Sequence, residues 1–205
     1  VDFEFLSGVV RPSPQAIRIG YAGTILVERE FALLVSCLAR IRHTLNRPLS
    51  LEFWGAHSYR NRSWFNSEWM HEHGNLPEPA LTQALRECSW GFSPMALHDE
   101  DPRYNRFSLP TKFISYLAAG LPIITMGHPE SSVAKMAAEY RVGVLQTRAD
   151  LEEFSARLFT ALSAANPAEE FRPEIMRCAR EQFDAARMRA VLHECFRTGA
   201  TRWQA

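Results

Sequence analysis

The chain has 205 residues, with 23 basic and 23 acidic side chains and a sequence pI near 7.2. Such a neutral composition gives no sign of the positive field with which proteins bind nucleic acids, so no nucleic-acid partner is expected. Hydrophobic residues make up 46% of the chain, an ordinary share for a globular protein. The length suits one domain with a sizeable core, or at most one and a half domains.

The cysteines and the apolar runs indicate in which cellular compartment the protein is found. Cys37, Cys88, Cys178 and Cys195 are widely spaced and form no C-x-x-C pair, which favours reduced thiols over a disulfide framework. No apolar run approaches the roughly 20 residues of a membrane-spanning helix, so we expect no transmembrane segment in this domain. The protein is therefore expected to be cytoplasmic, or attached peripherally to a membrane as part of a longer chain.

The hydrophobic pattern predicts strands that alternate with helices. Strands are expected at Ile17–Tyr21, Leu49–Trp54, Met70–His73, Trp90–Pro94, Ile123–Met126 and Val142–Gln146. The pattern at Trp64–Glu72 is ambiguous and leaves open whether a short helix precedes the third strand. Helices are expected at Glu28–Leu45, Ala80–Glu87, Ser131–Tyr140, Leu151–Leu162, Pro167–Glu181 and Asp184–Arg197. This order predicts an α/β fold: a Rossmann-like, doubly wound parallel sheet of about six strands with helices on both faces.

The segment Tyr104–Thr125, which reads YNRFSLPTKFISYLAAGLPIIT, carries the strongest functional signal. It predicts a helix with one face formed by Leu109, Phe113, Tyr116, Leu117 and Gly120, and another by Ser108, Lys112, Ser115 and Ala119. Ser108 suits the N-cap and Pro110 the first turn, and Gly120 ends the helix. Free amides, the positive end of the helix dipole and Lys112 then predict a site for phosphate oxygens.

The pattern SLPTKFISYLAAGLPII resembles the nucleotide-sugar-binding signature of GT-B glycosyltransferases, in the branch of group 1 (family 4 type) enzymes. That signature reads small-x-Pro-Ser/Thr-Lys, an aromatic or aliphatic residue, a Glu-Tyr pair and Ala-Ala-Gly-x-Pro. Ser115 stands where the family has the Glu that holds the donor ribose. Phe107 stands where many relatives have the first Glu of an E-x7-E motif. The resemblance implies the C-terminal, donor-binding half of a GT-B fold.

The resemblance also implies a substrate and a partner domain. The substrate would be a UDP- or GDP-linked sugar, used without a cofactor or a metal, and an N-terminal domain of the same protein would hold the acceptor. Residues 1–16 would be the remnant of an interdomain linker, residues 17–165 the nucleotide-sugar-binding domain, and residues 166–205 C-terminal helices packed on it. This donor half alone should bind the nucleotide sugar without turning it over.

Other candidates lie in loops that follow the strands, where ligands bind in such sheets. The Tyr21–Thr24 turn matches a Tyr-x-Gly-Thr turn of the family and suits the β-phosphate, the edge of the neighbouring domain or a simple turn. His73–Pro77 resembles a His-Gly-x-x-Pro turn that cradles the nucleobase, with a plain strand-to-helix loop as the alternative. The candidate nucleotide-sugar-binding residues are Gly23, Thr24, Gly74, Arg103, Asn105, Ser108, Leu109, Pro110, Thr111, Lys112 and Ser115, and no catalytic residue is identified.

Three further groups have two interpretations each. In the loop His98–Arg106, the arginines either approach the diphosphate or are solvated, and a carboxylate either replaces the missing ribose partner or is solvated. His71 and His73 share a strand face but have no third ligand at a suitable spacing, so we expect no metal site. The aromatic residues Trp54, Tyr59, Trp64, Phe65 and Trp69 either stack on a ligand or pack in the core.

The sequence therefore favours the donor domain of a glycosyltransferase. A non-catalytic nucleotide-sugar-binding or interaction module of GT-B origin is the alternative, which Ser115 and Phe107 favour. A sugar-nucleotide epimerase of related architecture ranks last, because it would need catalytic carboxylates and histidines that the sequence does not clearly supply.

Overall fold

A computed structural model describes residues 15–199, so nearly all of the linker expected at residues 1–16 lies outside the described residues. The strands are β1 (Ile17–Ala22), β2 (Leu49–Trp54), β3 (Met70–Glu72), β4 (Trp90–Pro94), β5 (Ile123–Met126) and β6 (Gly143–Gln146). They form one parallel sheet in the order β3-β2-β1-β4-β5-β6. The predicted Rossmann-like α/β sheet is confirmed.

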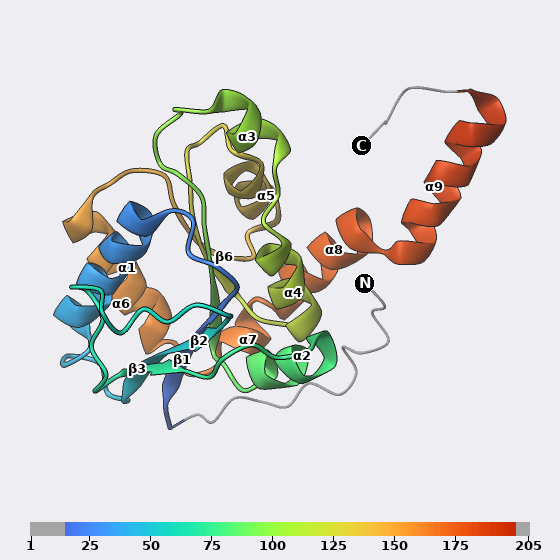
Figure 1. Ribbon diagram of the computed structural model, residues 1–205. Coiled ribbons are helices and arrows are strands. Elements are labelled where there is room, and N and C mark those ends of the chain that lie inside the picture. The colour runs from blue at the N-terminus through green and yellow to red at the C-terminus, as the bar shows by residue number, and fades with distance from the viewer. Residues whose placement is uncertain (1–14, 200–205) are drawn as a thin grey trace.

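Helices cover both faces of the sheet (Figure 1). One face packs against α1 (Glu28–Ile41) and α6 (Leu151–Ser163). The other packs against α2 (Glu78–Arg86), α4 (Thr111–Ala119), α5 (Ser132–Tyr140) and α8 (Arg172–Phe183). Two short helices, α3 (Pro102–Phe107) and α7 (Pro167–Glu170), lie in connections, and α9 (Ala185–Thr198) comes last.

Strand β1 shows why this sequence forms a two-faced sheet. Its alternate residues Ile17, Ile19 and Tyr21 belong to the core beneath α1 and α6, where Tyr21 meets Phe31 edge to face at 4.9 Å. Between them, Gly20 faces α2: a Cβ there would stand 3.1 Å from Leu85 and Cys88. Because successive side chains of a strand point to opposite faces, one strand joins both cores.

The start of α4 differs from its prediction. Pro110, not Ser108, occupies the N-cap, and no side chain caps the helix. Ser108 instead ends α3, a helix that the sequence interpretation missed, and its N–H donates to the Tyr104 carbonyl at 3.0 Å. Asp101 caps α3 by accepting from the Tyr104 amide at 3.1 Å, so Asp-Pro was the overlooked start signal. Ala119, expected on the same face of the helix as Lys112 and Ser115, is buried.

Other boundaries also moved. The helix expected to reach Leu45 ends at Ile41, whose carbonyl accepts from the Thr44 hydroxyl at 2.8 Å. The helix expected at Pro167–Glu181 is interrupted at Phe171, giving α7 and α8. Pro173, near the start of α8, has no N–H to donate to the preceding turn, so one continuous helix is disfavoured there.

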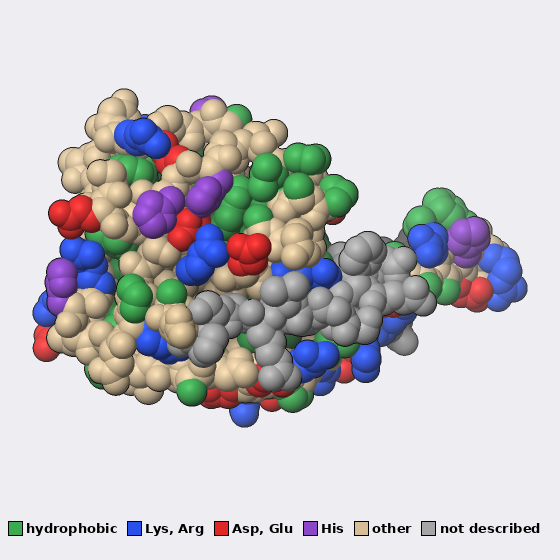
Figure 2. All heavy atoms as spheres, turned by 90° about the horizontal axis from the view of Figure 1, so that it is seen from below, with side chains coloured by type: hydrophobic (Ala, Val, Ile, Leu, Met, Phe, Trp, Pro, Cys, Tyr) green, Lys and Arg blue, Asp and Glu red, His purple; other side chains and the backbone are tan. Residues whose placement is uncertain are grey.

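The two long C-terminal helices differ in how far they pack on the domain. None of the residues of α9 is buried, whereas α8 buries Ile175, Cys178 and Ala179. Both views show α9 standing away from the rest of the molecule (Figures 1 and 2).

Candidate functional site

A cavity of about 230 Å³ opens beside the start of α4, between the loops that follow β1 and β4. It is lined by Tyr21, Leu26, Val27, Pro94, Met95, Tyr104, Ser108, Leu109, Pro110, Thr111 and Lys112. β1 and β4 are neighbours in the sheet although they are not consecutive in the chain. The cavity thus lies at the point where the strand order reverses, which is where open α/β sheets bind ligands.

Lys112 gives this cavity its charge. Burial lowers the pKa of its ammonium group, and no carboxylate among the described residues pairs with it. Its Nζ lies 5.2 Å from the centre of the Tyr21 ring, within the range of a cation–π interaction. The cavity lining contains no acidic residue. A desolvated cation without a negative partner favours binding of an anion.

The backbone of α4 adds donors to the same place. As the first two residues of the helix, Thr111 and Lys112 have amides that find no acceptor in the described part of the chain. The N-cap, Pro110, brings no side-chain oxygen to satisfy them. Such amides at the positive end of a nine-residue helix suit phosphate oxygens.

Tyr116 fixes α4 against the sheet. Its hydroxyl accepts from the Ala22 amide at 3.1 Å and donates to the Phe92 carbonyl at 3.0 Å, and the residue is fully buried. Gly91 allows this approach, because a Cβ there would stand 2.4 Å from the ring of Tyr116. Just before the first residue of α4, the Ser108 carbonyl accepts a hydrogen bond from the Ser132 hydroxyl of α5. The helix start is therefore held from β1, β4 and α5.

The loop after β1 is held by two tyrosines. The Tyr21 hydroxyl donates to the Thr24 carbonyl at 2.8 Å, and the Tyr59 hydroxyl accepts from the Ile25 amide at 3.0 Å. Gly23, directly before Thr24, has a φ of +99°, which favours glycine. The wall of the cavity formed by Leu26 and Val27 therefore follows directly from a fixed turn.

A second cavity, of about 240 Å³, lies on the other side of the end of β1. Three glycines border it and extend the pairing of the sheet: the Gly23 amide donates to the Trp54 carbonyl at 2.7 Å, and the Gly55 amide donates to the Gly74 carbonyl at 2.9 Å. The remaining lining residues are Phe53, Trp54, Ala56, His57, Ser58, Tyr59, Arg60 and Glu72. The Glu72 carboxylate accepts from Ser58 at 2.9 Å and from Arg60 at 3.1 Å, which fixes the outer wall.

The structure separates the predicted site residues into three groups. Ser108, Leu109, Pro110, Thr111 and Lys112 line the first cavity. Gly23 and Gly74 line the second. Thr24, Arg103, Asn105 and Ser115 line neither. The residues missed from the sequence are the apolar and aromatic walls, above all Tyr21, Leu26 and Tyr104, because nothing in their local pattern distinguishes a cavity wall from a core position.

Two of the outlying candidates are engaged within the protein. The Asn105 amide nitrogen donates to the His98 carbonyl at 3.3 Å and to the Asp99 carboxylate at 2.9 Å. The Ser115 hydroxyl donates to the Thr111 carbonyl within α4 at 3.3 Å. Arg106 lies 3.9 Å from Asp99. Asn105 therefore organises the loop before α4.

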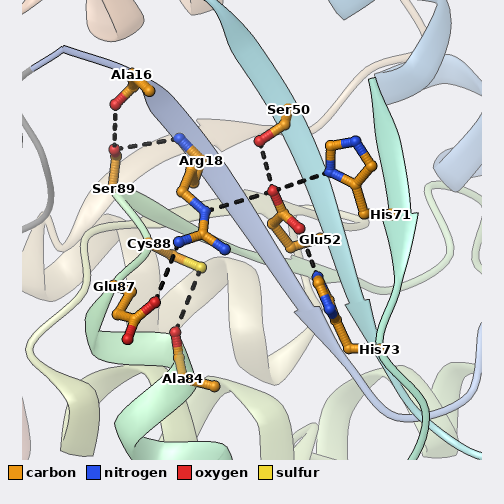
Figure 3. A network of polar contacts seen from close by, with 10 residues as sticks. All are labelled: Ala16, Arg18, Ser50, Glu52, His71, His73, Ala84, Glu87, Cys88 and Ser89. Atoms are coloured by element: carbon orange, nitrogen blue, oxygen red, sulfur yellow. Dashed lines mark hydrogen bonds and ion pairs between the residues drawn. The ribbon is translucent and has the colours of Figure 1, made fainter. Parts of the chain in front are cut away.

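His71 and His73, at which no metal site is expected, flank a buried carboxylate (Figure 3). Glu52 is 3% exposed; its oxygens lie 3.3 Å from His71 Nδ1 and 2.6 Å from His73 Nε2, and it accepts from Ser50 at 2.6 Å. The Nε of Arg18 lies 3.4 Å from the Glu52 carboxylate, and the Arg18 guanidinium also pairs with Glu87 at 3.2 Å. Within residues 15–199, no group of three or more His, Cys, Asp or Glu side chains is arranged to hold a metal ion. Histidine, acidic and basic side chains also gather on the face drawn in Figure 2.

The aromatic cluster packs in the protein interior. Tyr59 and Trp69 are buried in the core beneath α1, and Trp64 and Phe65 pack against that core. Trp54 lies on the opposite face, where its ring stacks on His73 at 5.0 Å. The core-packing interpretation therefore describes these residues, although Trp54 and Tyr59 also reach the second cavity.

Comparison with known proteins bears on the fold. Neither protein-family models nor curated proteins give a match to the sequence. Among solved structures, the C-terminal domain of a glycosyl transferase group 1 family protein (LpcC) from Francisella tularensis superposes with a TM-score of 0.61 at 10% identity, covering 90% of this chain and 99% of that domain. The chain has the fold of a GT-B C-terminal domain.

Two further structures share this GT-B fold. The catalytic domain of cholesterol-α-glucosyltransferase from Helicobacter pylori gives a TM-score of 0.60 at 14% identity, covering 80% of this chain and 98% of that one. A mutant of TarM from S. aureus, in complex with fondaparinux, α-GlcNAc-glycerol and UDP, gives a TM-score of 0.62 at 9% identity and covers 93% of this chain. The chain spans 37% of the length of TarM. No helix within residues 15–199 is long and apolar enough to cross a membrane.

Proposed function

We propose that the chain is the donor-binding domain of a glycosyltransferase and binds a UDP- or GDP-linked sugar through its diphosphate. The observation that carries this proposal is the Lys112 ammonium, desolvated and without a negative partner, in a cavity at the unsatisfied start of α4. A diphosphate would accept hydrogen bonds from the amides of Thr111 and Lys112 and would pair with the ammonium.

The same groups have a role in catalysis in this proposal. When the bond between the sugar and the diphosphate breaks, negative charge grows on the departing oxygen. Fixed donors and a cation that need no rearrangement stabilise this charge more than they stabilise the ground state. The resident groups can do so without a metal, and the acceptor would be held by a further domain of a longer, cytoplasmic protein. The UDP in the TarM complex supports a nucleoside diphosphate as the ligand.

One observation favours the alternative, a non-catalytic nucleotide-sugar-binding module. Ser115, at the position of the ribose-binding Glu, lies outside both cavities and bonds within its own helix. The first cavity has no acidic lining residue that could replace it. A longer protein that contains this chain and binds the donor, but transfers no sugar to any acceptor tried, would favour this module.

The binding claim can be tested by isothermal titration of the chain with UDP and GDP. The chain has only two lysines, which provides a matched control: Lys135 is exposed and pairs with Glu130 at 2.7 Å. We expect Lys112→Ala to weaken binding about tenfold to a hundredfold, as loss of a charged hydrogen bond does, and Lys135→Ala to leave it unchanged. A folded chain that binds neither nucleotide, or equal binding by Lys112→Ala and the parent chain, would overturn the proposal.

A further inference from the structure

The mouth of the α4 cavity has an apolar rim that an anion site does not require. Leu26 is 72% exposed, Tyr104 45% and Phe107 84%, and the first two line the same cavity as Lys112. The other large hydrophobic side chains that are exposed in the described chain lie on α6 or α9. Exposed apolar side chains gathered at one place mark a binding surface more often than single ones do.

Helix α3 holds part of this rim in place. Tyr104 and Phe107 are three residues apart and are therefore neighbours on the helix surface. Between them, Asn105 points inward and ties the helix to the preceding loop through its hydrogen bonds to His98 and Asp99. Asp101 caps the first turn. We call Leu26, Tyr104 and Phe107 the rim platform; its two aromatic rings are presented by an anchored helix.

The position of the rim platform limits what can lie on it. In the proposed complex, with the diphosphate at Lys112, the reacting carbon of the sugar would lie toward the mouth of the cavity. The acceptor oxygen must come within about 3–3.5 Å of that carbon. Atoms that adjoin the acceptor hydroxyl are then brought to the cavity mouth, where two members of the platform form the wall.

We propose that the rim platform contacts an apolar part of the acceptor, so that the acceptor is amphipathic: a hydroxyl next to an alkyl, acyl or isoprenoid group, as in a glycolipid. The inference rests on the proposed donor function. In the transfer, the bond between the sugar carbon and the diphosphate oxygen breaks and the electron pair leaves with the diphosphate. The acceptor oxygen forms the new bond and gives its proton to the departing diphosphate. An apolar group over the platform would also exclude water, which competes as an acceptor.

The test compares two probes that differ only in their apolar part. Methyl β-D-glucopyranoside and octyl β-D-glucopyranoside, the latter below its micelle concentration, are titrated by NMR into the chain saturated with UDP or GDP. We expect the octyl compound to bind at least about tenfold more tightly, because burying an alkyl chain against three apolar side chains is worth at least that factor. In Phe107→Ser, the ratio of the affinity for the octyl compound to that for the methyl compound should fall toward one. Phe159, exposed on α6, supplies the control Phe159→Ser, which should keep the preference.

The outcomes distinguish this inference from the proposed function. If the nucleotide binds but the octyl and methyl probes bind equally, or Phe107→Ser keeps the preference, the rim platform does not receive an apolar acceptor. A dimer in sedimentation that Phe107→Ser abolishes, without an octyl preference, would make the platform a protein interface and would overturn the inference. If neither nucleotide binds, the donor function itself fails. Unchanged thermal unfolding of each variant shows that the fold is kept.

Discussion

The Lys112 ammonium of helix α4 lies 5.2 Å from the centre of the Tyr21 ring of strand β1. The two residues are 91 positions apart in the chain and line one cavity. The aromatic face stabilises the cation without neutralising it, so the full charge stays available to an anion. The Tyr21 hydroxyl meanwhile holds the Thr24 carbonyl, so one side chain supports both the cation and the adjoining turn.

Replacing Lys112 by Met should stabilise the ligand-free protein while weakening nucleotide binding about tenfold to a hundredfold. Burial lowers the pKa of Lys112, which means that the unfolded chain holds this proton more tightly than the folded one. The charge therefore opposes folding at neutral pH, and its cost is relieved as the pH rises through the lowered pKa. We expect the free energy of unfolding to increase by roughly 0.5–1 kcal/mol, as is typical when a residue kept for function rather than for stability is replaced. Urea unfolding without ligand measures it, and a loss of stability in Lys112→Met would contradict it.

Nucleotide affinity should fall as the pH rises above neutrality. Only the protonated Lys112 attracts a diphosphate, and the lowered pKa brings deprotonation closer to neutral pH than for an ordinary lysine. Titration with UDP between about pH 7 and about pH 10 follows this loss. Tyr21→Leu, which removes the aromatic face, should shift the loss to lower pH, whereas Tyr21→Phe should keep it in place. Coincident profiles for Tyr21→Leu and the parent chain would show that the ring has no such role.

Tyr116→Phe should destabilise the protein by leaving two buried backbone groups without a hydrogen-bond partner. The buried hydroxyl accepts from the Ala22 amide and donates to the Phe92 carbonyl, and its removal leaves both without a partner. The expected loss in the free energy of unfolding is about 1–3 kcal/mol, measured by urea unfolding. Tyr140→Phe is the matched control: its hydroxyl bonds to the partly exposed Glu181 and Gln182, which can turn to water instead. Equal losses in the two variants would refute the argument.

Glu52→Gln should remove part of the acid sensitivity of the fold. Burial alone would raise the pKa of Glu52, but hydrogen bonds from Ser50, His73 and His71 and the charge of Arg18 lower it overall. A lowered pKa stabilises the protein at neutral pH, and this contribution is lost as the pH falls through the folded-state pKa. We expect Glu52→Gln to cost about 1–3 kcal/mol at neutral pH. The difference from the parent chain should shrink in acid, as urea unfolding at several pH values would reveal. A cost that stays the same at all pH values would mean that the charge of Glu52 is not what stabilises the fold.

Local patterns predicted the sheet well because each strand carries its own signal. Leu49–Trp54, Trp90–Pro94 and Ile123–Met126 were predicted with the observed bounds, since each is an apolar run that ends at turn residues. The end of α4 was equally local: Gly120, with a φ of +74°, adopts the left-handed conformation that glycine favours. By contrast, the separation of α7 from α8 was missed, although Pro173 was visible in the sequence.

The start of α4 shows where prediction from the local sequence was wrong. Ser108 has the chemistry of an N-cap, but its amide completes α3 and its carbonyl accepts from Ser132. Asn105, predicted to contact the ligand, donates hydrogen bonds from its side-chain nitrogen to His98 and Asp99 and so holds the loop. Both residues have groups that could serve either a ligand or the backbone, and the choice depends on which partners the fold brings near.

The sequence by itself determined the alternation of strands and helices and the parallel sheet, and it singled out Lys112 and its helix start as a candidate anion site, because propensity, periodicity and turn chemistry are encoded within short windows. The tertiary structure alone decided that Tyr21 lies beside Lys112. It also decided that both histidines contact the Glu52 carboxylate, and that Leu26 and Tyr104 line the same cavity. The physical reason is the parallel order β3-β2-β1-β4-β5-β6: each crossover brings together residues far apart in the chain, and no local pattern records which loops meet at the edge of the sheet.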